Sequence, residues 1–362
     1  MGSFFDIFKG RPDRAVGIDI GSSSIKVVEL QRKGQFVELV TYGLLETGPY
    51  GGREIGRVAT LTTERTAEAL KDVMRESRVS TNVSGIAIPF RSSFMRLIDL
   101  PQVTESELDR MVPIEARKYV PVPIGEVSLD WALVPQIIPQ MGALQSTEQQ
   151  VHVFLIAIHN DILSRFKDIS TGATLDNRFY EVEAYSSMRS VLSVSNEAIM
   201  LCDIGASSTK TYITYKGYII ATHIINAGAE DMTLALSKSF GITIGEAEAM
   251  KREKGLTSGK DDDLTKSLEL VLQRIITDLI RAKEDFESKY KTNITKVILV
   301  GGGAQLKGLP EAIEEKIKIE TKKGNGFSQV KTPAFLTGTV AEIGPEFSVA
   351  TGCALRAILG ER

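Results

Sequence analysis

Short hydrophobic runs alternate with polar turns over the first quarter of the chain, and one longer segment has helical spacing. The runs at residues 15–20, 25–31 and 36–45 are rich in aliphatic side chains and predict three strands. Residues 62–77 carry an apolar side chain every three or four positions, which predicts a helix. A buried strand is predicted at 84–89. Together these elements predict a compact α/β half-lobe.

The pattern becomes less regular over the next part of the chain. Thr104 and Glu107 form a capping-box pattern that predicts the start of a helix, and Pro113 is expected to kink or restart it. Further predicted elements are strands at 94–101, 126–134 and 151–158, a helix at 161–170 and a Gln-rich loop at 138–150. Because this part interrupts two similar halves, we interpret residues 90–178 as an inserted subdomain.

The second half of the chain repeats the strand-rich opening and then becomes more helical. Strands are predicted between residues 198 and 226 and at 296–300, and helices at 230–240, 245–253, 264–290 and 348–359. The predicted division has a first lobe at 1–89, to which 179–197 and 345–362 return. The predicted second lobe covers 198–344 and includes a helical subdomain at 228–294.

One octet occurs twice. Residues 19–26 read Asp-Ile-Gly-Ser-Ser-Ser-Ile-Lys, and residues 203–210 read Asp-Ile-Gly-Ala-Ser-Ser-Thr-Lys. One interpretation is two unrelated hairpin turns, because short motifs recur by accident. The six identical positions and the shared strand-turn-strand setting favour a duplication instead. Serine hydroxyls and turn amides are donors that surround phosphate oxygens, so the two copies predict a nucleotide in a cleft between two related lobes.

Composition narrows the choice of function. The chain has 362 residues, enough for two or three domains, and its net charge of −3 lacks the basic excess of a nucleic-acid-binding protein. The two cysteines and three histidines show no metal-binding spacing, and no hydrophobic stretch approaches a membrane span. Residues 1–11 are apolar and then basic, so they form either a short tail that packs on the body or a segment on a membrane surface.

The octets and two later motifs resemble those of the actin-like ATPase superfamily, which includes actin, the Hsp70 ATPase domain, sugar kinases, MreB and FtsA. The octets are similar to its two phosphate turns, residues 299–309 to its adenosine motif and residues 350–356 to its second connecting helix. These motifs occur in the superfamily's order and span the chain. The resemblance implies a two-lobe actin-like fold of duplicated ribonuclease H-like lobes, with ATP or ADP and Mg²⁺ in the cleft.

Within that superfamily the sequence resembles the PilM family of type IV pilus assembly proteins. Residues 17–30, Leu100-Pro101 before a helix, and residues 115–124 carry this resemblance. The inserted subdomain also has the position that it has in PilM and FtsA. FtsA usually ends in a linker and an amphipathic membrane helix, and neither is expected after Gly360.

The resemblance also implies a set of nucleotide-binding residues. Asp19 and Asp203 would face each other and hold a hydrated Mg²⁺, which prefers oxygen ligands, although Asp203 could instead only cap its own turn. Lys26 would balance phosphate charge. Lys210 is either a second such cation or an exposed side chain. The other expected contacts are Gly21, Ser22, Ser23, Ser24, Gly205, Ser207, Ser208, Thr209, Gly228, Glu248, Lys251, Gly301, Gly302, Gly303 and Leu306.

Several of these residues have a stated role or a competing interpretation. Only some of the turn hydroxyls are expected to point inward, because side chains alternate along a strand. Gly228 opens a helix whose N-terminus is expected to face phosphate. Glu248 and Lys251 resemble ribose and adenine contacts, or they form an ordinary surface ion pair. Glu183 resembles the group that orients water for hydrolysis, although Ala184 stands where the superfamily usually has proline.

The resemblance implies an ATP-binding assembly protein with at most slow ATPase activity, in the cytoplasm and peripheral at the inner face of the cell membrane. The implied partner is the N-terminal cytoplasmic tail of a PilN-like membrane protein, held between the first lobe and the inserted subdomain. Other pilus assembly proteins and a second copy of the chain are further expected partners. The alternatives are an FtsA- or MreB-like filament-forming ATPase and, with less support, a small-molecule kinase, for which no second acidic motif is visible.

Overall fold

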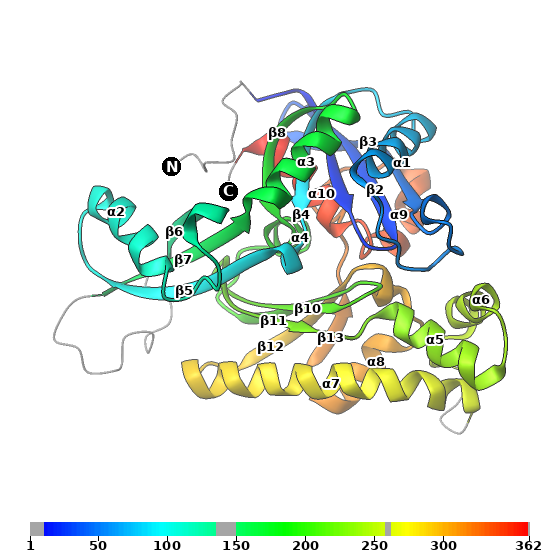
Figure 1. Ribbon diagram of the computed structural model, residues 1–362. Helices are drawn as coiled ribbons and strands as arrows, with labels where there is room; N and C mark the ends of the chain where they lie inside the picture. Colours follow the sequence, from blue (N-terminus) through cyan, green and yellow to red (C-terminus); the bar gives the residue numbers. More distant parts are fainter. Residues whose placement is uncertain (1–10, 135–149, 258–261, 361–362) are drawn as a thin grey trace.

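Two five-stranded sheets with the same order of strands are found within residues 11–134, 150–257 and 262–360, which this computed structural model describes (Figure 1). The first sheet has the order β3-β2-β1-β4-β8, and the second has β11-β10-β9-β12-β13. In each sheet the first three strands in this order are antiparallel and the last three are parallel. The expected duplicated α/β architecture is therefore confirmed.

The first sheet and its helices form the upper lobe in Figure 1. Its strands are β1 (Arg14–Ile20), β2 (Ser24–Lys33), β3 (Phe36–Glu46), β4 (Val83–Ile88) and β8 (Asp176–Val182). Its helices are α1 (Thr63–Glu76), α3 (Asn160–Gly172), α4 (Glu183–Val191), α9 (Thr337–Ile343) and α10 (Ser348–Leu359).

The second sheet and its helices form the lower lobe, with the longest helix along its outer side (Figure 1). Its strands are β9 (Ala198–Ile204), β10 (Thr209–Tyr215), β11 (Tyr218–Ile225), β12 (Ile294–Val300) and β13 (Glu320–Lys323). Its helices are α5 (Ala229–Phe240), α6 (Ile244–Lys254), α7 (Asp263–Tyr290) and α8 (Leu309–Ile317).

A third sheet projects from one side of the first lobe (Figure 1). Its order is β5-β7-β6, with β5 (Ser93–Pro101), β6 (Val127–Val134) and β7 (Gln150–His159) all antiparallel. Helix α2 (Glu105–Ala116) covers one face, where its Leu108 and Val112 are buried. The expected capping box at Thr104 and Glu107 is present, and the helix is not interrupted at Pro113.

The chain passes between the first and third sheets at two connections. The position of the second connection differs from the boundary predicted at residue 178. The third sheet occupies Ser93–His159, whereas α3 packs on α1 and β8 joins the first sheet. We therefore propose that the insertion ends close to residue 159, not at 178. The Gln-rich loop predicted at 138–150 lies almost entirely outside the described residues.

A segment that the sequence placed in the second lobe packs instead on the first. Lys331 pairs with β3, since its N–H donates to the Val37 carbonyl at 2.9 Å and its carbonyl accepts from the Leu39 N–H at 2.9 Å. Phe327 and Val340 are buried in the same cluster as these β3 side chains. We propose that the first lobe resumes near residue 325 rather than at 345.

Helix α10 lies directly on β1, and glycine makes this contact possible. A Cβ atom added at Gly17 would lie 1.9 Å from the Ala350 carbonyl oxygen, so no larger residue fits without moving the helix. Every residue of α10 before Leu359 is buried. Because α10 packs this closely against β1, the strand that carries Asp19 is held in place.

A buried ion network ties the same helix to β8 and α4. Glu181 on β8 accepts hydrogen bonds from Arg189 at 2.6 Å and from Arg356 of α10 at 2.9 Å. Burial opposes ionisation of Glu181, but the two guanidinium groups hold its pKa at about 2. The network holds the C-terminal end of β8 in place. Glu183, the first residue of α4, follows directly after this strand.

The elements predicted from hydrophobic spacing agree closely with the structure, whereas β8, β13, α8 and α9 were not predicted. Most of the N-terminal stretch 1–11 lies outside the described residues. Among the helices that the structure describes, none combines the length and hydrophobicity needed to cross a membrane.

Substitution of Gly17 by alanine is expected to destabilise the protein by about 2–3 kcal/mol, because the added methyl group forces α10 away from β1. Urea denaturation followed by circular dichroism measures this change. Gly338→Ala in α9 is the matched control, since nothing lies within 4 Å of its added Cβ, and it should be neutral or slightly stabilising. Equal stability of Gly17→Ala and the wild type would contradict the close contact.

Candidate functional site

The two octets form equivalent turns that face each other. In the first turn the Gly21 N–H donates to the Ser24 carbonyl at 3.0 Å, and in the second the Gly205 N–H donates to the Ser208 carbonyl at 3.0 Å. Each turn connects two antiparallel strands of its own sheet. The hydroxyl of Ser22 donates to that of Ser207 at 3.3 Å, so the turns meet across the cleft.

A cavity of about 570 Å³ lies between the lobes at these turns. This volume falls within the usual range of small-molecule sites. The cavity brings together nearly all of the predicted residues, which are Asp19, Gly21, Ser22, Ser23, Ser24, Lys26, Glu183, Asp203, Gly205, Ser207, Ser208, Glu248, Lys251, Gly301, Gly302, Gly303 and Leu306.

Thr209 and Gly228 are the two predicted residues that do not line the cavity. The buried Thr209 hydroxyl donates to the Ala227 carbonyl at 2.9 Å, because strand alternation turns it to the other face. The N–H of Gly228 is bound by Asp231 at 2.8 Å, and the next two amides donate to carbonyls of the second turn. The amides of residues 228–230 are therefore engaged within the protein.

Gly228 has a packing role instead. A Cβ atom there would lie 2.3 Å from the Ala206 carbonyl oxygen, so only glycine lets α5 begin so close to the second turn. The helix start predicted at Gly228 is confirmed, and its contact with phosphate stays a prediction.

Asp19 and Lys26 occupy the floor of the first turn. They are opposite each other in the β1–β2 pairing, and Lys26 Nζ lies 3.7 Å from Asp19 Oδ2. The same ammonium donates to the Ser24 hydroxyl at 2.9 Å. Burial raises the pKa of Asp19 above its usual value, although Lys26 and Lys210 oppose that shift.

Lys210 occupies the corresponding position of the second turn, and its side chain is only 14% exposed. Its Nζ lies 2.9 Å from Asp203 Oδ2 and 3.1 Å from Glu183 Oε1. Although burial disfavours the charged form, these carboxylates raise the pKa of Lys210. The suggestion that Lys210 is exposed is therefore wrong, and the residue belongs to the site.

Glu183 is the first residue of α4 and points into the cavity from the first lobe. Its Oε1 accepts the backbone N–H of Phe90 at 2.7 Å and also faces Lys210. Burial is the main reason why the pKa of Glu183 is raised, and the neighbouring Asp203 and Asp19 add to the shift. The cross-lobe contact with Lys210 fixes this carboxylate above the two turns.

The far end of the cavity is formed by α5 and α6. Lys251 Nζ lies 2.7 Å from Glu248 Oε2, and both side chains bind the buried Thr233 hydroxyl. Arg252 Nε lies 2.7 Å from the other Glu248 oxygen. The interpretation of Glu248 and Lys251 as an ordinary surface pair is wrong, because both residues are buried in the cavity wall.

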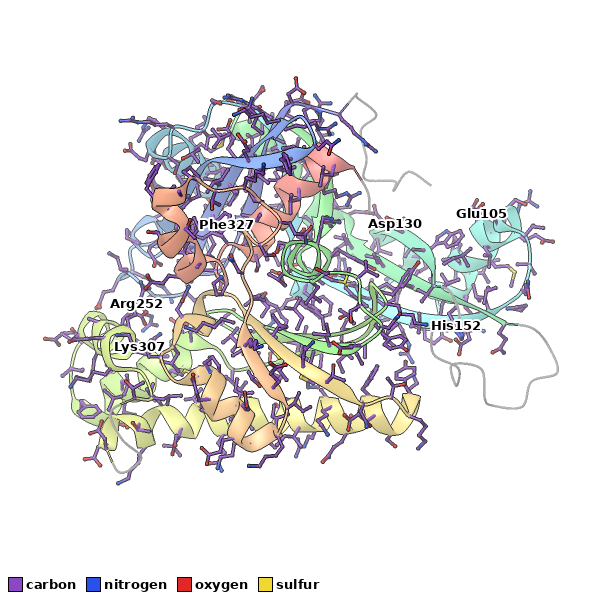
Figure 2. The ribbon with its side chains drawn as sticks, turned by 180° about the vertical axis from the view of Figure 1, so that it is seen from behind. Glu105, Asp130, His152, Arg252, Lys307 and Phe327 are labelled. Carbon is purple, nitrogen blue, oxygen red and sulfur yellow. The ribbon has the colours of Figure 1, made fainter. Side chains whose placement is uncertain are left out.

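Several contacts that close the cleft come from loops and were not predicted. Arg57 pairs with Glu230 of α5 at 2.8 Å, and Glu54 accepts the Gly245 N–H at 2.9 Å. Figure 2 shows Arg252 and Lys307, which also line the cavity, on the second lobe. No periodic pattern marks such loop residues in a sequence, so only the fold reveals them.

The donor set permits a hydrated metal ion but does not form a complete metal cage. Across the described residues, no group of three or more histidine, cysteine, aspartate or glutamate side chains could hold an ion. Asp19 and Asp203 both present oxygen atoms to the cavity. Mg²⁺ is commonly held by one or two carboxylates together with waters and substrate phosphates, and this arrangement fits the pair.

Comparisons with known proteins identify one family across almost the whole chain. The family model described as "Type IV pilus assembly protein PilM" matches residues 17–358. A chain of a PilM-PilN type IV pilus biogenesis complex has a TM-score of 0.81 and 26% identity, covering 96% of this chain and 99% of that chain. The cell division protein FtsA of Neisseria meningitidis serogroup B is 23% identical over 88% of this chain and 87% of its own length.

A more distant structure shares the fold alone. MreB 5 of Spiroplasma citri bound to AMPPNP has a TM-score of 0.54 and 13% identity, covering 96% of each chain. The expected actin-like fold is therefore confirmed.

Asp19→Asn is expected to increase the stability of the nucleotide-free protein at pH 7. Folding raises the pKa of the Asp19 carboxyl above its unfolded value of 3.8. The folded protein therefore loses stability as the pH rises from 3.8 towards the pKa of the folded state. The variant should therefore be more stable than the wild type at neutral pH, and the difference should disappear below pH 3.8. Urea denaturation at both pH values measures this, with Asp109→Asn on the exposed side of α2 as control. A less stable Asp19→Asn at pH 7 would contradict the assignment.

Proposed function

The chain belongs to the PilM family of type IV pilus assembly proteins, and from this premise we propose that it is an ATP-binding component that recruits an inner-membrane pilus protein. The observation that carries the nucleotide proposal is the meeting of two equivalent turns at one cavity. Ser22 and Ser207 approach within 3.3 Å, so a group between the turns would receive donors from both lobes.

We propose that the nucleotide phosphates lie between the turns and the adenosine lies towards α6. Ser22, Ser23 and Ser24 of the first turn and Ser207 and Ser208 of the second offer hydroxyl and amide donors. At the other end, the base and ribose would lie against Gly301, Gly302 and Gly303, next to Leu306, Glu248 and Lys251, all of which line the cavity. Buried Lys26 supplies positive charge at the phosphate end.

A magnesium ion completes this proposal. Asp19 and Asp203 would hold Mg²⁺ through water, and the ion would neutralise part of the phosphate charge. Glu183 is the candidate for orienting a water molecule, because it is a buried carboxylate at the phosphate end of the cavity. Its oxygen is already engaged by Phe90 and Lys210, which favours slow turnover over rapid catalysis.

We propose that the partner is the N-terminal cytoplasmic tail of a PilN-like membrane protein. The cavity extends from the turns to both connections between the first lobe and the third sheet, where Arg91 and Ser92 precede β5 and Ile162 and Phe166 lie on α3. Ile162 and Phe166, together with Leu61, line this end of the cavity with apolar side chains, of the kind that bind a short peptide. Binding of a PilN-type tail would hold the protein at the inner face of the membrane. Other pilus assembly proteins would then bind to the complex of the protein and this tail.

Ser207→Asp is expected to weaken ATP binding by about a hundredfold, which is about 3 kcal/mol, because it places a carboxylate between the phosphate turns. Isothermal titration calorimetry with ATP and Mg²⁺ measures the affinity. Ser106→Asp, in the exposed first turn of α2, is the control and should bind as the wild type does. Unchanged affinity in Ser207→Asp would mean that the phosphates do not lie between the turns.

Ile162→Asp is expected to weaken binding of the PilN-type tail by about tenfold, because a carboxylate on α3 must then be desolvated against an apolar peptide. Fluorescence anisotropy with a labelled synthetic peptide of that tail measures the affinity. Leu270→Asp on α7 makes the same change at a side chain that is 74% exposed and outside the cavity. No binding of the tail to the wild type, or equal losses in both variants, would contradict the proposed peptide site.

A further inference from the structure

The two octet lysines occupy the same position in their turns but differ in their surroundings. Lys26 lies 3.7 Å from one carboxylate, Asp19, which belongs to its own lobe. Lys210 lies 2.9 Å from Asp203 of its own lobe and 3.1 Å from Glu183 of the other lobe. Lys210 therefore bridges two carboxylates across the cleft, as Lys26 does not.

This bridge is buried at the phosphate end of the cavity. The side chains of Lys210, Asp203 and Glu183 are 14%, 7% and 7% exposed. Two carboxylates that share one compact cation at about 3 Å have the arrangement that a divalent metal ion usually provides. Because one oxygen of each carboxylate already contacts the ammonium, these two groups have less need of a metal ion to compensate their charge.

We propose that Lys210 is a built-in cation that supplies part of the charge a divalent metal would otherwise supply in this cleft. Nucleotide phosphates then bind next to a pair of carboxylates that the protein has itself partly neutralised. Affinity for a nucleoside di- or triphosphate accordingly depends only weakly on Mg²⁺. This inference rests on the proposed nucleotide function, and it adds a residue that determines how the site responds to metal.

A purely structural role for Lys210 gives a different expectation. If the ion pair only held the lobes together, its removal would lower stability and weaken nucleotide binding to the same extent with and without metal. A role as counter-cation changes the ratio of the two affinities, because Mg²⁺ can replace a missing positive charge next to Asp203 and Glu183. The ratio therefore separates the two roles.

The first measurement is the affinity of the wild-type protein for ADP, by isothermal titration calorimetry, with excess Mg²⁺ and with excess EDTA. We expect a loss of less than about tenfold when the metal is removed. A loss of about a hundredfold or more overturns the inference and leaves the proposed function intact. Absence of binding in both conditions overturns the inference and the proposed function together.

The second measurement repeats the titrations on Lys210→Met and Lys210→Arg. The ratio of the ADP affinity in Mg²⁺ to the ADP affinity in EDTA should be at least about ten times larger for the methionine variant than for the wild type. The arginine variant should keep the wild-type ratio. Lys296→Met is the matched control, because Lys296 pairs with Glu197 at 2.8 Å outside the cavity. An unchanged ratio in Lys210→Met contradicts the inference.

A third measurement uses metal alone. Nucleotide-free Lys210→Met should bind Mn²⁺ more tightly than the wild type in titrations followed by electron paramagnetic resonance, because Asp203 and Glu183 then lack their cation. Equal Mn²⁺ affinity contradicts the inference. If Lys210→Met does not fold, the wild-type comparison of Mg²⁺ and EDTA decides alone.

Discussion

Two backbone hydrogen bonds, one in each lobe, fix the geometry on which the cleft depends. The bonds from Gly21 to Ser24 and from Gly205 to Ser208 close the turns, and each turn follows a buried strand that ends one residue after an aspartate. Because the strands on either side are paired along their whole length, the turns cannot move without disturbing both sheets. The positions of Asp19, Lys26, Asp203 and Lys210 follow from these two turns.

The same arrangement concentrates charge where water is scarce. Asp19, Asp203 and Glu183 lie close together and buried, and burial makes ionisation of Asp19 and Glu183 costly. Lys26 and Lys210 offset part of that cost, but neither aspartate has the surrounding donors of Glu181, which two arginines hold ionised. A site whose negative charge is incompletely compensated within the protein is suited to a positively charged group that binds together with the phosphates.

The sequence predicted those features that depend on local order. Both turns, the duplicated sheets and α10 follow from patterns that recur within a few residues, and the family resemblance identified the shape that they build. The sequence could not predict the partners that Thr209, Gly228 and Lys210 have in the structure. These partners, Ala227, Asp231 and Glu183, are set by strand alternation, helix capping and contact between lobes. The return of Lys331 to β3 was missed for a similar reason, since a single pair of backbone hydrogen bonds in a loop leaves no periodic signal.

The central claim is that one nucleotide binds to both turns at once, and a crystal structure of the protein grown with ADP tests it most directly. The account predicts phosphate oxygens within hydrogen-bond distance of donors in residues 22–24 and in residues 207–208, with the base against Gly301, Gly302 and Gly303. Density for ADP elsewhere on the protein, or against one turn only with the other turned away, would contradict it.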